Sequence, residues 1–86
     1  MGLHSSLAGN NFSPAMAADA LFELGLSYSI GDGVPQDLVL AHKWLNLAAM
    51  SGSERARSIR AEIASCMTPD QIAEAQRLAR EWRQTH

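Results

Sequence analysis

Residues 20–52 read ALFELGLSYSIGDGVPQDLVLAHKWLNLAAMSG. Apolar residues recur at helical spacing on both sides of a short segment, GDGVP, which contains two glycines and ends in proline. Such a segment ends one helix, since glycine accepts a left-handed backbone and proline cannot continue a helix. The pattern therefore predicts an αα-hairpin, the unit that helical repeat proteins stack side by side.

The same stretch holds fourteen positions of one pattern in a single frame. In residue identity and spacing it resembles a Sel-one-like repeat (SLR), which is a relative of the tetratricopeptide repeat (TPR). The resemblance implies stacked helix pairs that bind other proteins, with no catalytic activity, and it leaves the partner open. The matching positions are Ala20, Leu24, Gly25, Tyr28, Gly31, Gly33, Val34, Pro35, Asp37, Ala41, Trp44, Ala48, Ala49 and Gly52.

A second, degenerate unit is expected to follow. The pair Ala41 and Trp44 recurs 38 residues later as Ala79 and Trp82, close to the period of these repeats. Charged outer faces suit a unit that ends a stack in water. We divide the chain into a flexible arm (1–15), an SLR domain (16–83) with a full repeat (16–52) and a degenerate capping repeat (53–83), and a tail (84–86).

The predicted fold class is all-α, with αα-hairpin repeats whose four antiparallel helices form a short right-handed solenoid segment like those of TPR and SLR proteins. Apolar periodicity places the helices at 14–30, 38–51, 54–67 and 69–83. At least one of Gly31 and Gly33 is expected to have positive φ. Asp37 is expected to cap the second helix by accepting an amide hydrogen bond from residue 39 or 40. Thr68 and Gln71 have the spacing of a capping box.

The helix at 14–30 has two apolar faces. One comprises Ala17, Ala20, Leu21, Leu24 and Tyr28. The other has no preceding repeat to cover it, so we expect an exposed protein-binding strip there: Phe22, Leu26 and Ile30. Gly25 lies inside this helix, where glycine costs about 1 kcal/mol relative to alanine. We therefore expect the second helix to approach Gly25 closely.

The helix at 38–51 is expected to turn Ala41, Trp44, Leu45 and Ala48 inward. Trp44 and Trp82 are expected at equivalent places, each packed against the first helix of its own unit. The outward side is unusually apolar for a repeat of this kind. It is a candidate protein-binding surface, unless the arm or a bent third helix covers it. Its residues are Val39, Leu40, Lys43, Leu47 and Met50.

No catalytic, cofactor-binding or metal-binding residues are expected. His4, His42 and His86 lie in three separate segments, whereas a metal site needs three or four converging ligands. His42 is interpreted as a polar residue at the edge of its helix. Cys66 falls on the apolar stripe of the helix at 54–67, so we expect a buried structural thiol.

Composition narrows the choice of partner. The net charge of −2 favours neither nucleic acid nor an anionic membrane. Apolar runs are too short for a membrane span. Cys66 is the only cysteine, so no intrachain disulfide can form, and this favours a reducing, cytoplasmic compartment such as that of a bacterial family member.

The function indicated is an adaptor or scaffold that binds a partner protein through apolar helix faces and is not an enzyme. A small regulatory or toxin-neutralising subunit of a larger assembly is the alternative. Repeat arrays generally need about three units to bury a continuous core, and this chain has two at most. We therefore expect a homodimer through one apolar strip, with the other strip left for the partner.

Overall fold

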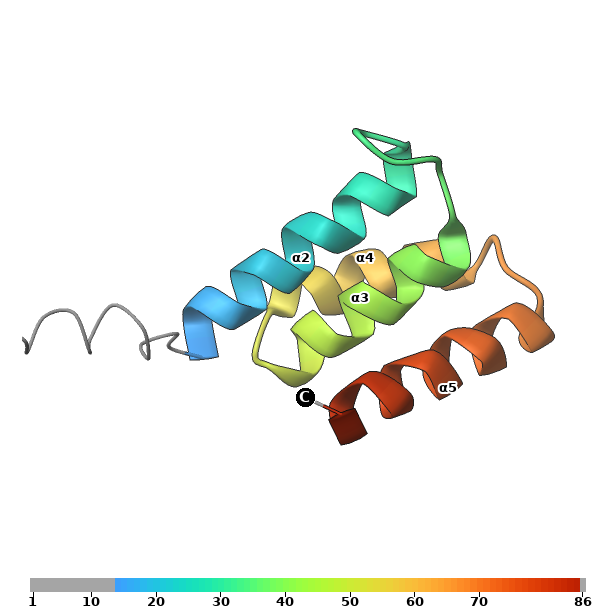
Figure 1. Ribbon diagram of the computed structural model, residues 1–86. Helices are drawn as coiled ribbons and strands as arrows, with labels where there is room; N and C mark the ends of the chain where they lie inside the picture. Colours follow the sequence, from blue (N-terminus) through green and yellow to red (C-terminus); the bar gives the residue numbers. More distant parts are fainter. Residues whose placement is uncertain (1–13, 86) are drawn as a thin grey trace, which may run out of the picture.

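The protein is described by a computed structural model over residues 14–85, with side chains from residue 17 onward. Four α-helices and no strands make up these residues (Figure 1). The helices are α2 (Pro14–Ile30), α3 (Leu38–Met50), α4 (Glu54–Ala64) and α5 (Pro69–Thr85). The all-α prediction is confirmed. The expected flexible arm lies outside the described residues up to position 13, and α5 includes residues 84 and 85 of the expected tail.

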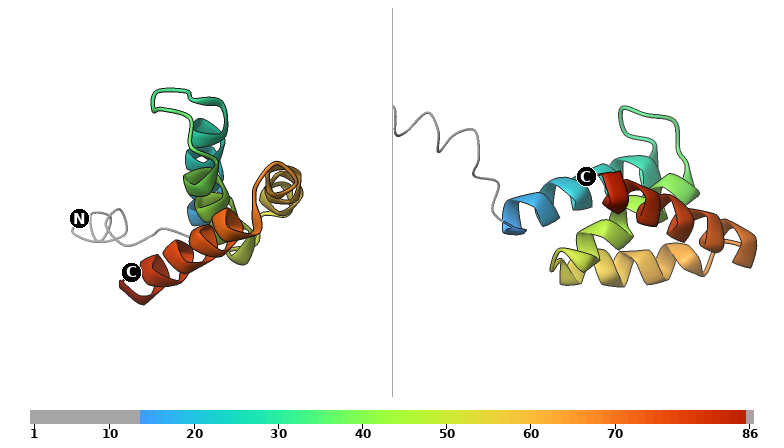
Figure 2. Two further views of the ribbon diagram at one scale, coloured as in Figure 1. Left: turned by 90° about the vertical axis from the view of Figure 1, so that its right-hand side faces the viewer. Right: turned by 60° about the horizontal axis from the view of Figure 1, so that its bottom comes forward.

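Helix α3 lies at the centre of the described part, and each of the other three helices packs against it. Viewed nearly end-on, α2, α4 and α5 surround α3 on different sides (Figure 2). Helices α3 and α5 run in the same direction, opposite to α2 and α4 (Figure 1). This alternation is that of an all-α repeat fold built from antiparallel helix pairs.

Helices α2 and α3 pack closely at Gly25, which has no side chain. A Cβ atom built on Gly25 would lie 2.6 Å from Cγ and 3.2 Å from the backbone nitrogen of Leu45. No other residue type fits there without movement of α3. The expected close approach at Gly25 is confirmed, and it explains why α2 tolerates glycine at its centre.

Two glycines allow the backbone conformation of the turn between α2 and α3. Gly31 and Gly33 have φ of 75° and 79°, a region that favours glycine. The Asp37 side chain accepts a hydrogen bond of 3.0 Å from the Leu40 amide and so caps α3. The Asp37 amide donates to the Tyr28 carbonyl oxygen at 2.9 Å, which fastens the start of α3 to α2. Both predictions for the turn are confirmed.

Two further caps define the ends of the C-terminal helices. Ser53 caps α4 by accepting from the Ala56 amide at 3.1 Å. Before α5, the Gln71 amide donates to Thr68 Oγ1 at 3.1 Å, and the Thr68 amide donates to Gln71 Oε1 at 2.9 Å. This reciprocal pair is the predicted capping box.

Helix α4 is shorter than predicted and ends at Ala64. Ser65 closes it: its amide donates to the carbonyl oxygens of Ala61 and Glu62, and its hydroxyl donates to the Glu62 carbonyl oxygen. Cys66 therefore lies beyond the helix and is exposed. The prediction of a buried structural thiol was wrong, because it extended the apolar stripe past the true end of the helix.

The core is small and rich in alanine. Its buried cluster is Phe22, Leu45, Ala48, Ala49 and Ala56, with Leu21, Leu26, Ile59 and Ile63 packed against it. Phe22 is only 3% exposed. The Arg55 guanidinium lies over the Phe22 ring, with its central carbon Cζ 4.5 Å from the centre of that ring. The prediction that Phe22 forms part of an exposed strip was wrong, because α2 turns this side, and not the face containing Ala20, toward α3 and α4.

The two tryptophans meet instead of occupying separate, equivalent sites. The rings of Trp44 in α3 and Trp82 in α5 pack edge to face, with their centres 5.5 Å apart and their planes at 80°. Both are partly buried. Trp82 was expected to pack against α4, the first helix of its own unit, and this was wrong, since α5 packs mainly on α3.

Candidate protein-binding surface

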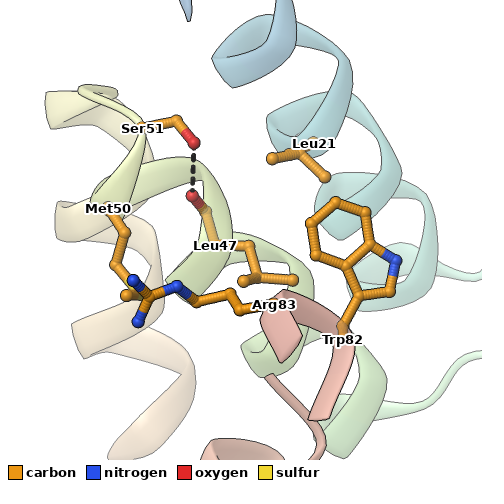
Figure 3. A pocket seen from close by; sticks show the side chains of 6 residues that line it. All are labelled: Leu21, Leu47, Met50, Ser51, Trp82 and Arg83. Carbon is orange, nitrogen blue, oxygen red and sulfur yellow. Dashed lines mark hydrogen bonds between the residues drawn. The ribbon is translucent and has the colours of Figure 1, made fainter. Parts of the chain in front are cut away.

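A groove of about 370 Å³ opens where α2, α3 and α5 meet. We call it the α2–α3–α5 groove. Figure 3 shows the Leu21 side chain and the Trp82 indole pointing toward one another, with Leu47 to one side of them. The Arg83 side chain extends across the opening toward Met50 (Figure 3). The lining residues are Leu21, Leu47, Met50, Ser51, Trp82 and Arg83.

The floor and the mouth of this groove differ in exposure. Leu47 is buried, at 2% exposed, whereas Met50 one turn later is 50% exposed. The Ser51 hydroxyl donates to the Leu47 carbonyl oxygen at 3.0 Å, so this hydroxyl already has a hydrogen-bond partner at the end of α3. The groove is therefore apolar at its base, and Arg83, the one charged residue among its described lining residues, lies at the opening.

Helix α5 explains why Leu47 is buried, although an exposed side chain was expected. Leu47 was expected on an exposed outward side of α3, and this was wrong because α5 covers that side through Trp82. The other outward residues are not fully covered. Val39, Leu40 and Lys43 are partly exposed, and the Lys43 ammonium lies 4.2 Å from the centre of the Trp44 ring.

Only two residues of the second predicted apolar strip, Leu26 and Ile30, are accessible at the surface, toward the C-terminal end of α2. Ile30 is 71% exposed, the largest value among the bulky apolar residues described, and Leu26 is half-buried against the core. The structure therefore separates the predicted surface residues into two regions. Met50 lies in the α2–α3–α5 groove, whereas Leu26 and Ile30 lie near the turn that leads to α3.

The charges along α5 are unevenly compensated. Arg77 forms an ion pair with Glu74 at 2.7 Å and a second one with Glu81. The hydrogen bond from Arg77 lowers the pKa of the Glu74 carboxyl. Arg80 and Arg83 are exposed, and neither forms an ion pair within residues 14–85. Positive charge therefore remains beside the groove, at Arg83.

A polar cluster that sequence reasoning missed lies between α3 and α4. His42 is buried at 4% exposed, and its Nδ1 atom has no hydrogen-bond partner among the described residues. Burial, with a smaller effect of the nearby Arg60 charge, lowers the pKa of the His42 imidazole. Arg60 donates to Asn46 Oδ1 at 2.6 Å across the same interface. The interpretation of His42 as an edge residue was wrong, since α4 covers it.

Neither a metal centre nor a membrane helix is found among residues 14–85. No group of three or more His, Cys, Asp or Glu side chains in that range could hold a metal ion. None of the described helices is long and apolar enough to cross a bilayer. His4 and His86 lie outside these residues.

Packing and turn chemistry together define an αα-hairpin repeat protein with a groove that apolar and polar residues line. The family model described as Sel1 repeat matches residues 18–53, which comprise most of α2, the turn, α3 and the cap of α4. This match supports an SLR/TPR-like repeat protein, and Sel1 repeats generally mediate protein–protein interaction. No curated protein and no solved structure matches the chain.

The family match stops short of the groove's third side. It contains Leu21, Leu47, Met50 and Ser51 but not Trp82 or Arg83. The assignment of residues 53–83 to a degenerate second repeat stays a prediction. The recurrence of Ala41 and Trp44 as Ala79 and Trp82 was the sequence signal for α5, but it did not reveal that the two indoles touch.

Proposed function

We propose that this protein is an adaptor or scaffold module that binds a partner protein through apolar helix surfaces and catalyses no reaction. The observation that carries the proposal is the α2–α3–α5 groove, in which three helices offer apolar side chains around an open space. Exposed apolar surface that is rimmed by polar residues is typical of protein-binding sites. Met50, half-exposed at its mouth, is the residue expected to contact the partner first.

The second exposed region supports self-association as part of the same proposal. Ile30 and Leu26 lie at the end of α2 that leads into the turn, and Ile30 is 71% exposed there. A homodimer would bury them and leave the groove free for the partner. Light scattering after size exclusion should give twice the 9.3 kDa chain mass, and Ile30→Glu should return it to the mass of one chain. A cooperatively folded wild-type monomer at micromolar concentration would contradict the dimer.

We also place the protein in the cytoplasm. The support is the single cysteine of the sequence, which cannot form an intrachain disulfide. Cys66 is exposed, so its thiol would be open to oxidation outside a reducing compartment. Fractionation of the source cell with a tagged chain tests this location.

Site-specific crosslinking tests the binding function. A photoreactive amino acid replaces Met50 in the groove, and in a control chain it replaces Ala61, which is exposed on α4. We expect a specific protein to crosslink from position 50 and not from position 61. That protein, once identified and purified, should bind the wild-type chain and bind Met50→Arg at least about tenfold more weakly. Equal crosslinking from both positions, or none from either, would count against an interaction module.

A further inference from the structure

We propose that the α2–α3–α5 groove takes an amphipathic helix of the partner protein, and that this helix carries an acidic side chain beside its apolar face. The inference rests on the proposed function and goes further by specifying the chemistry of the partner. Three observations carry it: the shape of the apolar surface, the uncompensated arginines of α5, and the position of the acidic residues of α2.

The apolar surface is long and straight. Ala17, Leu21, Leu24 and Tyr28 follow one another at intervals of four, three and four residues, so they share one face of α2. All four are partly exposed. At 1.5 Å per residue the row extends about 16 Å, or three helical turns. Leu21 belongs to both the row and the groove, so the two form one continuous surface.

A surface of this form fits a helix better than an extended peptide. Helix-in-groove recognition uses apolar anchors at i, i+3, i+4 and i+7, which span about 10 Å, or two turns, and so fit within a row about three turns long. An extended strand would need free backbone donors and acceptors along its path, and the groove is lined by helices whose backbone groups already pair within the helix. The open space of about 370 Å³, which Leu21, Leu47 and Trp82 help to line, then receives an anchor side chain.

The charge next to the groove selects an acidic partner. Arg83 lines the opening, and Arg80 lies one turn earlier on α5. Neither forms an ion pair among residues 14–85, whereas Arg77 pairs with both Glu74 and Glu81. A carboxylate presented by the partner would therefore meet two cations that no carboxylate of the described chain neutralises.

The acidic side chains of α2 do not offset these cations. Asp19 lines a different hollow, together with Glu54 and Arg55 at the start of α4. Glu23 follows Asp19 by four residues and so lies on the same side of α2, away from Leu21. The side of the groove formed by α2 is therefore apolar and uncharged, while the α5 side is positive.

A display selection on the full chain tests the proposal. The library consists of helical peptides with leucines fixed at i, i+3, i+4 and i+7 and with the other positions randomised. We expect the enriched peptides to carry Asp or Glu next to the leucine face, and to bind Arg83→Glu about fivefold more weakly than wild type. Arg57→Glu is the matched control, because Arg57 is an exposed arginine on α4 outside the groove.

Two further arms separate the alternatives. Placing a proline at the centre of an enriched peptide should abolish binding, since proline breaks a helix. On Arg80→Glu/Arg83→Glu the same library should enrich Lys or Arg in place of acids. Enrichment without charge preference overturns the proposal. So does a selection that enriches nothing because residues 1–13 or a second copy fill the groove. In either case, a partner that still crosslinks at position 50 leaves the proposed function intact.

Discussion

Leu45 approaches Gly25 so closely that a Cβ atom added to Gly25 would lie 2.6 Å from Leu45 Cγ and 3.2 Å from its backbone nitrogen. A change of side-chain rotamer at Leu45 would not relieve the second contact. The spacing between α2 and α3 is therefore set by the absence of one methyl group.

Gly25→Ala should destabilise the protein by up to about 2 kcal/mol. Overpacking costs about 1–3 kcal/mol, and the higher helix propensity of alanine returns about 1 kcal/mol of that. Urea unfolding followed by circular dichroism measures the change. Ala20→Gly on the exposed side of the same helix isolates the propensity effect. A Gly25→Ala chain as stable as wild type would show that α2 and α3 can move apart freely.

Trp82→Ala should lower the free energy of unfolding by about 2–3 kcal/mol, somewhat less than for a fully buried tryptophan. The loss follows from the contact with Trp44, through which α5 is held on α3. A double-mutant cycle with Trp44→Ala should give a coupling of about 0.5–1.5 kcal/mol beyond simple burial. Additive effects of the two substitutions would mean that the ring contact contributes nothing. Trp82→Phe is the conservative control.

Asp37→Ala should cost about 1 kcal/mol, because the Leu40 amide loses its cap at the start of α3. Asparagine keeps an acceptor oxygen at the same place, so Asp37→Asn should stay within a few tenths of a kcal/mol of wild type. Thermal unfolding of both variants at one pH makes the comparison. Equal losses in the two variants would indicate that the charge of Asp37, and not its hydrogen bond, is what stabilises α3.

Stability should decrease as the pH falls below 6.5, because burial lowers the pKa of His42 in the folded state. Between the ordinary value of 6.5 and this lower pKa, the unfolded chain binds a proton on His42 that the folded chain does not. The free energy of unfolding then falls by at most about 1.4 kcal/mol per pH unit from this group. His42→Gln should flatten the profile in that window when unfolding is measured from pH 7.5 downward. An unchanged slope would assign the acid sensitivity to other groups.

The first helix pair could be predicted from sequence because its determinants are local. Glycine conformation, the arrest of a helix by proline and a side-chain cap each depend on a few neighbouring residues. The buried side of α2 could not be predicted in the same way. That helix is apolar on opposite faces, so periodicity alone does not distinguish the side of Phe22 from the side of Leu24.

The candidate site depended on tertiary packing that sequence patterns do not contain. The sequence pattern predicts that Leu47 points outward from α3, because it does not show that α5 covers this side. His42 is buried on the side of α3 where Arg60 of α4 lies nearby, and the sequence does not show this packing. The groove itself needs Leu21 and Trp82 to face one another, although they are 61 residues apart in the chain.

The contact between Trp44 and Trp82 also has a kinetic consequence. Helices α2 and α3 are joined by a short turn, so their contacts close small loops, whereas α5 reaches α3 only after the chain has closed a loop of 38 residues. Loop-closure entropy rises with length, and longer-range contacts tend to form later. We therefore expect the α2–α3 hairpin to form first and α5 to dock last. In the native state, the free energy of local opening should be lowest for α5, so its amide hydrogens should exchange with solvent faster than those of the other helices. Each opening of α5 transiently exposes Leu47.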